Sequence, residues 1–421
     1  MFVWLLVVMA VLGAPLFVLL GGAAMLGFHA IDYDPAIVAA EFQRIGQMPG
    51  LEAIPLFALA GYLLGAGQGP KRLVEVSEAW LGWLPGGLAV VAVVSCALFT
   101  AFTGASGVTI VALGGLLYPA MLSAGYPRPF VLGLLTAAGS LGLLFAPSLP
   151  LILYGFVAAQ MGSQPPVAVA DLFWAGLLPG TLMVVVLAAL CMRQGWKLPR
   201  GEQFSLARGL AAIRGAAWEL PLPVLVLGAI FSGWLAVSEA AAMTACYVLA
   251  VTCVIRRELS WRQFIDAASD AARMVGVLLI VLGMALALSN FMIDQEVPAR
   301  LFDWVSRHVD KPWLFLLCLN VFLLLVGMLL DIFSAIVILV PILLPLAQGF
   351  GIHPVHLGIV MLANLQLGYF TPPVGMNLFI ASFRFGEPVL SLVRHSWPFL
   401  LALLACLLAI TWLPWLSLAP L

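Results

Sequence analysis

Long apolar runs separated by short polar segments fill this sequence from end to end. A helix needs about 20 residues to cross the hydrocarbon core of a bilayer, and several runs reach that length. Unbroken membrane helices are predicted over residues 2–27, 51–66, 171–192, 272–290 and 396–418, and a short helix followed by a further span over 220–255. Residues 70–83 and 298–307 have the pattern of amphipathic helices at a membrane surface.

Two runs are too long for a single helix, and each divides into two apolar arms around a turn of small or polar residues. They cover residues 84–122 and 313–347, with turns at Thr103-Gly104-Ala105-Ser106-Gly107 and Asp331-Ile332-Phe333-Ser334. Each run predicts a helical hairpin that re-enters the membrane with its turn deep inside. For the first run, one long tilted helix with small residues at a packing face is the alternative.

Two further runs contain prolines that an unbroken helix does not tolerate. Residues 128–160 include Ala146-Pro147-Ser148, and residues 354–383 include the segment Gly-Tyr-Phe-Thr-Pro-Pro-Val-Gly-Met-Asn at 368–377. Non-helical backbone at this depth must be buried in protein or line a cavity, and broken helices hold ions and substrates in secondary transporters. Both runs therefore predict broken membrane helices, with a proline kink that binds nothing as the alternative.

The two halves of the chain repeat the same order of elements. Pro70-Lys71-Arg72-Leu73 corresponds to Pro298-Ala299-Arg300-Leu301, and Phe145-Ala146-Pro147 corresponds to Phe370-Thr371-Pro372. We therefore predict an all-α polytopic membrane protein of two repeats, residues 1–215 and 216–421. Each repeat would hold one re-entrant helical hairpin and one broken transmembrane helix.

The composition excludes a soluble protein, because 64% of the residues are hydrophobic and only 9% are charged. The formal net charge of -1 gives no basis for a nucleic-acid partner. The six cysteines show no CxxC spacing and are predicted to be small buried side chains.

Basic residues predict the orientation in the membrane. Most of the 18 lysines and arginines fall in segments 67–83, 122–129, 193–219, 256–273 and 384–395, which are therefore assigned to the cytoplasm. This places the N-terminus in the cytoplasm and the C-terminus on the opposite side. The hairpins would enter from opposite faces, so the repeats would be inverted, a symmetry that suits alternating access.

Oxygen-bearing residues at the turns and breaks are candidate ligands for sodium, which as a hard cation prefers oxygen. The first predicted sodium site comprises Thr103, Gly104, Ala105, Ser106, Gly142, Pro147 and Ser148. The second comprises Asp331, Ser334, Gly368, Thr371 and Pro372. As the one acid at a turn, Asp331 is equally compatible with capping the helix that follows.

An anionic substrate is predicted between the two ion sites, where helix N-termini and hydroxyls would hold it. The predicted substrate contacts are Ser106, Ser148, Asn364, Thr371 and Asn377. Asn364 and Gln366 are also compatible with hydrogen bonds between helices. No arginine is expected at membrane depth, because Arg128 and Arg384 fall at the predicted cytoplasmic face.

Two other classes of protein fit parts of the pattern. Gly104-Ala105-Ser106-Gly107 matches the GxSG motif of rhomboid intramembrane proteases, but that chemistry needs a histidine at the same depth. All five histidines (His29, His308, His353, His356, His395) fall near predicted helix ends. A channel with re-entrant loops is the other alternative.

The sequence resembles the large membrane subunit of tripartite ATP-independent periplasmic (TRAP) transporters, the DctM-like family. The resemblance covers nearly the whole chain through segments 54–61, 103–107, 118–121, 141–148, 238–242, 327–331, 341–345 and 368–377. Its most specific part is Thr371-Pro372-Pro373-Val374-Gly375. The first turn departs from the family, which usually has a sequence close to SGSS there, so backbone carbonyls are expected to supply more of the first ion site.

This resemblance implies a sodium-driven elevator-type transporter of the bacterial inner membrane that is not an enzyme and uses Na⁺ as coupling ion, without a further cofactor. It implies two partners, a small four-helix membrane subunit and a periplasmic substrate-binding protein. The implied substrate is an organic acid anion, such as a C4-dicarboxylate, sialic acid, a sugar acid or a keto acid.

Overall fold

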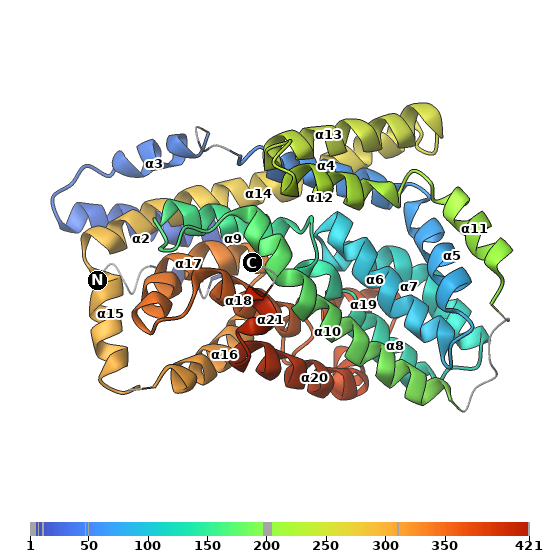
Figure 1. Ribbon diagram of the computed structural model, residues 1–421. Coiled ribbons are helices and arrows are strands. Elements are labelled where there is room, and N and C mark those ends of the chain that lie inside the picture. The colour runs from blue at the N-terminus through green and yellow to red at the C-terminus, as the bar shows by residue number, and fades with distance from the viewer. Residues whose placement is uncertain are drawn as a thin grey trace.

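The structure of the protein is a computed structural model that describes residues 6, 8–10, 12–46, 48, 50–196, 204–309 and 311–419. Over this part of the chain the regular structure is helical throughout (Figure 1). It includes seven helices long and apolar enough to cross a membrane, or eight with one bent pair counted as a span. The predicted all-α polytopic membrane protein is confirmed. Parts of the span predicted over residues 2–27 lie outside the described residues.

The first half of the chain forms surface, hairpin and broken helices in the predicted order. Its elements are α2 (Leu16–Ala30), α3 (Ile37–Ile45), α4 (Ala53–Ala66), α5 (Gly69–Leu81), α6 (Gly87–Thr103), α7 (Ser106–Ser123), α8 (Arg128–Ala138), the 3-10 turn η1 (Leu141–Leu144), α9 (Leu149–Gln160), α10 (Val169–Gly195) and α11 (Leu206–Gly215).

The second half follows with a similar series. Its elements are α12 (Pro221–Phe231), α13 (Val237–Leu249) with the π-helical turn η2 (Ala250–Ile255), α14 (Trp261–Asp294), α15 (Val297–Ser306), α16 (Pro312–Leu329), α17 (Ile332–Gly349), α18 (Pro354–Gly368), α19 (Met376–Phe385), α20 (Val389–Trp412) and α21 (Trp415–Leu418).

Three predicted boundaries are wrong. The span predicted over residues 2–27 is interrupted: residues 6 and 8–10 are helical, but α2 begins at Leu16, because Gly13 has a φ of 82° and Pro15 occupies the N-cap position. No helix is predicted within segment 193–219, yet it contains α11, whose N-cap Ser205 accepts a hydrogen bond from the Arg208 N–H. Helix α14 has 34 residues and starts well before residue 272, because Ser260 and Gln263 form a capping box there.

Both predicted hairpin turns are helix breaks. Helix α6 ends at Thr103 and α7 begins at Ser106, joined by Gly104, whose φ of 64° is easily reached without a Cβ. Helices α16 and α17 are joined by Leu330 and Asp331, which are both extended. The run 84–122 is therefore not one continuous helix. The depth of the turns in a membrane stays a prediction.

In each broken helix, the part after the break packs against the hairpin of the other half of the chain. The stretch from α8 to η1 is bent by 43° against α9, and residues 369–375 separate α18 from α19. Helix α9 packs against α17 of the second half, whereas α19 packs against α7 of the first. Each broken helix thus completes the hairpin of the other half. The inverted orientation of the two repeats stays a prediction.

Glycines allow the breaks to lie directly on the first hairpin arms. A Cβ at Gly368 would lie 2.5 Å from the carbonyl carbon of Gly327 on α16. A Cβ at Gly142 would lie 2.2 Å from the Ala97 carbonyl oxygen on α6. Since such distances are far inside van der Waals contact, only glycine permits this packing.

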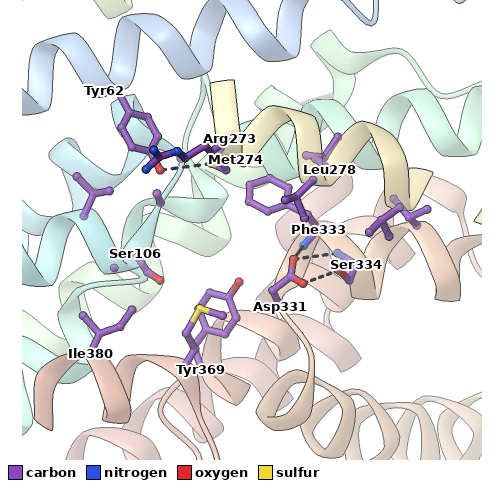
Figure 2. A pocket seen from close by; sticks show the side chains of 18 residues that line it. Tyr62, Ser106, Arg273, Met274, Leu278, Asp331, Phe333, Ser334, Tyr369 and Ile380 are labelled. Carbon is purple, nitrogen blue, oxygen red and sulfur yellow. Dashed lines mark hydrogen bonds between the residues drawn. The ribbon is translucent and has the colours of Figure 1, made fainter. Parts of the chain in front are cut away.

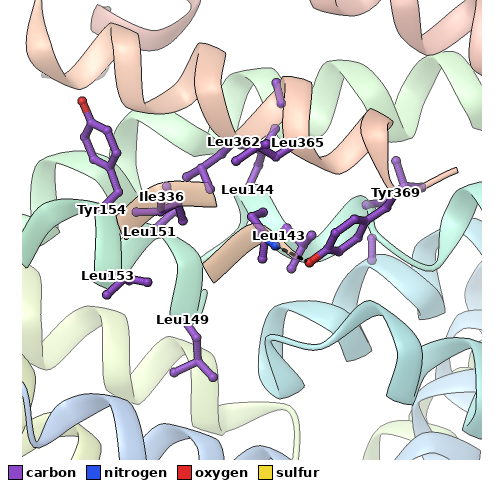
Figure 3. Close-up of a cluster of buried hydrophobic side chains, with 14 of the residues drawn as sticks. Leu143, Leu144, Leu149, Leu151, Leu153, Tyr154, Ile336, Leu362, Leu365 and Tyr369 are labelled. Carbon is purple, nitrogen blue, oxygen red and sulfur yellow. Dashed lines mark hydrogen bonds between the residues drawn. The ribbon is translucent and has the colours of Figure 1, made fainter. Parts of the chain in front are cut away.

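The apolar core surrounds the first break and α18. Leu143 and Leu144 of the 3-10 turn lie beside Leu362 and Leu365 of α18 in this core (Figure 3). All fifteen residues of α18 are buried, so this helix is enclosed by protein on every side. The prediction of buried cysteines is wrong for Cys246 and Cys318, which are exposed on the outer surface of α13 and α16, a surface that lipid can cover.

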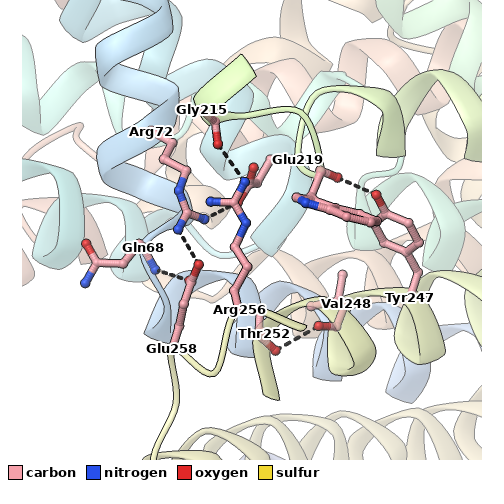
Figure 4. Close-up of polar contacts among 10 residues, drawn as sticks. Gln68, Arg72, Gly215, Glu219, Tyr247, Val248, Thr252, Arg256 and Glu258 are labelled. Carbon is pink, nitrogen blue, oxygen red and sulfur yellow. Dashed lines mark hydrogen bonds and ion pairs between the residues drawn. The ribbon is translucent and has the colours of Figure 1, made fainter. Parts of the chain in front are cut away.

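An ion cluster joins three segments at one end of the bundle (Figure 4). Arg72 of α5 forms ion pairs with Glu219, just before α12, and with Glu258, just before α14. The Gln68 N–H donates to Glu258 at 2.8 Å, and Arg256 donates to the Gly215 carbonyl at 2.7 Å. Burial lowers the pKa of the Arg72 guanidinium, but its hydrogen bonds and the charges of both carboxylates outweigh burial and raise the pKa.

Candidate functional site at the two helix turns

A cavity of about 490 Å³ lies between the two hairpin turns (Figure 2). The first turn contributes Gly104, Ala105 and Ser106, and the second contributes Asp331 and Ser334. Helix α14 and α4 close the remaining sides, and Tyr369 and Met376 reach the cavity from the second break. The cavity therefore brings together elements from both halves of the chain.

The first turn presents the N-terminal end of α7 to this cavity. No side chain caps α7, and among the described residues no acceptor is found for the N–H groups of Ser106, Gly107 and Val108. Ser106 is only 4% exposed and lines the cavity. Free N–H groups at a helix N-terminus, reinforced by the helix dipole, favour an anion.

The remaining residues of the first predicted ion site lie behind the cavity wall. Thr103 and Ser148 are fully buried, and their hydroxyls donate to the carbonyls of Phe99 at 3.1 Å and Leu143 at 2.6 Å. Gly142 packs on α6, as described above. Pro147 lies against α4 and α12 rather than at the cavity. A Cβ at Gly104 would lie 2.9 Å from Leu149, so the turn does adjoin the break.

The second turn is organised by Asp331, the N-cap residue of α17. Its Oδ2 accepts the N–H groups of Phe333 and Ser334, both at 3.0 Å, and its Oδ1 accepts the Ser334 hydroxyl. The Tyr369 hydroxyl accepts the Ile332 N–H at 2.7 Å. The capping role left open by the sequence is therefore present, and the carboxylate also lines the cavity. Tyr369 ties the second break to the second turn.

Most predicted substrate contacts do not line the cavity. Ser106 does, whereas Ser148 is buried behind the wall, and the Thr371 hydroxyl donates to the Leu367 carbonyl at 2.8 Å. Asn377 is fully buried and donates to the Thr136 carbonyl of α8 at 3.4 Å. These side chains satisfy backbone acceptors at the broken helices.

Asn364 belongs to a polar network between helices. Its amide donates to Asn320 of α16 at 2.6 Å, and Asn320 donates to Thr411 of α20 at 3.1 Å. Gln366 is equally buried, and its amide lies 3.4 Å from the Met183 sulfur of α10. Both residues therefore fit the alternative role, polar contacts between helices, better than the predicted role of substrate contact.

Arg273 of α14 lines the cavity and was missed by sequence reasoning. The sequence assigned it to a cytoplasmic segment, and the expectation of no arginine at membrane depth stays a prediction. Its guanidinium lies 3.5 Å from Asp270, and both side chains are largely exposed. Residue 273 falls just inside the span predicted to begin at 272, so its position in the sequence could have indicated a charged residue at the edge of a membrane helix.

A second cavity of about 810 Å³ continues the first toward the start of α14. The two share Tyr62, Val108, Met274 and Ile380 among their lining residues. Asp266 and Asp270 line the outer one. It therefore forms a vestibule through which the central cavity is reached from the end of the bundle where α14 begins.

The chemistry of the site rests on oxygen atoms, backbone amides and one guanidinium. Within the described part of the chain, no group of three or more His, Cys, Asp or Glu side chains could hold a metal ion. None of the five histidines is among the described residues that line the cavity. The arrangement has charges of both signs, with Asp331 at one turn and Arg273 opposite.

A polytopic helical bundle with a cavity between two helix turns, reached by one of two broken helices, has the architecture of a membrane transport protein. Residues 2–416 match the family described as Tripartite ATP-independent periplasmic transporter, DctM component. The chain belongs to this family, and the resemblance seen in its sequence is confirmed.

Three similar proteins are named as transporter permeases. The C4-dicarboxylate TRAP transporter large permease protein DctM of Pseudomonas aeruginosa is 35% identical over 371 residues, covering 88% of this chain and 85% of the relative. The isethionate TRAP transporter permease protein DctMQ of Oleidesulfovibrio alaskensis is 36% identical over 96% of this chain, which spans 63% of that relative. The 2,3-diketo-L-gulonate TRAP transporter large permease protein YiaN of Escherichia coli is 30% identical, covering 96% of this chain and 93% of the relative.

A solved structure has the same fold. The crystal structure of the Alcanivorax borkumensis YdaH transporter superposes with a TM-score of 0.61, covering 90% of this chain and 87% of that one. The sequence identity is 17%, so this likeness concerns the fold alone.

Proposed function

We propose that the chain is the large membrane subunit of a sodium-coupled TRAP transporter that imports an organic acid anion by an elevator mechanism. It would act in the bacterial inner membrane, with its N-terminus in the cytoplasm and its C-terminus in the periplasm. Its partners would be a small four-helix membrane subunit and a periplasmic substrate-binding protein. The observation that carries the proposal is the central cavity between the two turns, with its uncapped helix N-terminus and its arginine.

The cavity suits a small organic anion in size and in charge. Its volume of about 490 Å³ falls in the range of small-molecule sites. The N–H groups of Ser106, Gly107 and Val108, the Ser106 hydroxyl and Arg273 offer donors from two sides. Three of the relatives are named for isethionate, C4-dicarboxylates and 2,3-diketo-L-gulonate, which supports this substrate class.

The second turn offers a donor set that fits sodium. Asp331 supplies a carboxylate and Ser334 a hydroxyl. All of these atoms are oxygens, the ligands that hard cations prefer. At the first turn, Thr103 and Ser148 donate their hydrogens to carbonyls, which leaves their oxygen lone pairs as acceptors.

The vestibule supports alternating access. It connects the cavity with the end of the bundle that the basic residues assign to the cytoplasm, so under this proposal the conformation would be inward-open. Transport would then require the hairpins and broken helices to move relative to α4 and α14, until the cavity opens at the other end.

The proposal is tested by uptake into liposomes that hold this chain and its small subunit. A panel of labelled organic acids and their purified binding proteins would be offered under an imposed sodium gradient. We expect sodium-dependent accumulation that is lost in Ser106→Ala and reduced at least tenfold in Arg273→Gln. Arg262→Gln, an exposed arginine outside both cavities, serves as the matched control.

Other results would refute the proposal. Downhill flux of the substrate that does not depend on sodium would favour a channel. Cleavage of a membrane-embedded peptide that requires Ser106 would favour a protease. If Arg262→Gln impaired uptake as much as Arg273→Gln, the effect would reflect general surface charge rather than the cavity.

A further inference from the structure

A third cavity of about 570 Å³ lies away from the transport site, where α8, α10 and α20 meet. It is lined by Arg193 and Gln194 at the end of α10, by Arg394 and His395 near the start of α20, and by Phe130 and Phe399. The ring centroids of Phe130 and Phe399 are 5.5 Å apart, and the two rings form an apolar wall. None of these residues takes part in the site described above.

Among the described residues, nothing compensates the charge in this cavity. No acid is among the described residues that line it, and no ion pair is found for Arg193 or Arg394 within the described part of the chain. Glu387, an acid close by in the sequence, is already paired with Arg128. Two guanidinium groups around one cavity attract an anion with several oxygens, such as a phosphate.

A buried polar atom points to the same ligand. The Nδ1 atom of His395 is shielded from solvent and has no hydrogen-bond partner in the described part of the chain. His395 lines the cavity, and a small rotation of its ring would bring this costly unpaired atom within reach of a ligand there. The cavity thus combines two cationic donors with a ring nitrogen that lacks a partner.

The depth of the cavity in the membrane is indicated by tryptophans. Trp196 follows α10 and is 71% exposed, and Trp397 of α20 is 50% exposed. Exposed tryptophans gather where the hydrocarbon core meets the headgroups. Beyond them, exposed apolar side chains such as Val185 and Leu401 cover the outer surface of both spans. A headgroup in the cavity would therefore have its acyl chains along α10 and α20.

We propose that this cavity binds the phosphate headgroup of an anionic phospholipid, at the end of the bundle assigned to the cytoplasm. Arg193 and Arg394 would contact the phosphate, His395 would complete its hydrogen bonds, and the acyl chains would lie on the apolar faces of α10 and α20. Basic pockets between membrane helices are typical sites for such lipids.

The test compares lipid retention in two double variants that lose the same charge. R193Q/R394Q removes both arginines of the cavity, and R214Q/R262Q removes two exposed arginines assigned to the same face but outside it. The full chain, purified in detergent, is titrated with cardiolipin, with phosphatidylcholine and with inorganic phosphate. Bound lipid is counted by native mass spectrometry, and the thermal unfolding midpoint is recorded.

We expect cardiolipin to remain bound and to raise the unfolding midpoint of the wild type, while phosphatidylcholine and inorganic phosphate do not. Each arginine near an anionic lipid contributes about fivefold in affinity, so R193Q/R394Q should bind about thirtyfold more weakly. R214Q/R262Q should bind like the wild type. The single variants R193Q and R394Q, with a loss of about fivefold each, supply the same test if the double variant does not fold.

Equal cardiolipin affinity in both double variants would overturn the proposal, as would equal binding of phosphatidylcholine. Stabilisation by inorganic phosphate that matches that by cardiolipin would mean a site for a free anion, and would also overturn it. Since none of these residues lies at the central cavity, either result leaves the transport proposal untouched.

Discussion

Replacement of Asp331 by asparagine should separate the two roles of this side chain, helix capping and ion binding. Both backbone N–H groups that it caps, those of Phe333 and Ser334, donate to the same oxygen, Oδ2. The single carbonyl oxygen of an asparagine can take that position, and its amide group can donate to the Ser334 hydroxyl. Asparagine is as good an N-cap as aspartate, so Asp331→Asn should fold with nearly unchanged stability.

Asp331→Ala is the matched comparison, because it removes the charge and the cap together. Loss of an N-cap costs about 0.5–2 kcal/mol, and here two N–H groups at 3.0 Å lose their acceptor. We therefore expect a loss of stability near the upper end of that range for alanine only. Thermal unfolding of both purified variants in the same detergent measures the difference.

Both variants should need more sodium for uptake. A hydrogen bond or contact to a charged group contributes about 1.5–3 kcal/mol, which corresponds to a rise of about tenfold to a hundredfold in the sodium concentration at half-maximal uptake. The assay is the liposome uptake described above, with sodium varied at constant ionic strength. If Asp331→Asn kept the sodium dependence of the wild type, Asp331 would be a cap alone and the second ion site would be misplaced.

Three further predictions concern other parts of the molecule. Thr371→Val removes the hydroxyl of a predicted sodium ligand at the second break, and we expect stable protein whose uptake needs more sodium. Unchanged sodium dependence would contradict the predicted role of Thr371 as a sodium ligand. Gly368→Ala forces a methyl group into the backbone of α16 and should lower the free energy of unfolding by about 1–3 kcal/mol. The control, Gly276→Ala, places its methyl group in open space and should not lower the unfolding midpoint. Arg72→Met leaves the buried Glu219 without its partner and should cost about 3–5 kcal/mol in unfolding measurements; a loss under 1 kcal/mol would show that the ion cluster is not stabilising.

The helix breaks could be predicted from the sequence because their causes are local. Gly104 adopts a left-handed conformation between two helices, and Asp331 caps the helix that begins beside it. The prolines at 372 and 373 cannot continue α18. Each of these effects acts within a few residues, so a single sequence contains the information.

The cavity wall could not be predicted in the same way, because it depends on distant partners. Asn364 has the composition of a substrate contact, yet its partner Asn320 lies 44 residues away on another helix. Arg273 looked like a residue of a cytoplasmic segment, but α14 starts earlier than its apolar stretch does and lies beside both turns. Which side of a buried helix faces a cavity is decided by packing, and α18 has no polar side to reveal it.

The two turns are chemically different, and the difference does not lie in the polar side chains of the second break. Thr371 and Asn377 lie there, but both side chains donate to backbone carbonyls. The contrast lies in the N-termini of α7 and α17. The N-terminus of α7 is uncapped and presents free N–H groups, whereas Asp331 neutralises that of α17 with a carboxylate. An uncapped terminus favours an anion, and a carboxylate among hydroxyls favours a cation. The first turn is therefore the better place for the substrate, and the second for the sodium ion whose charge would offset it.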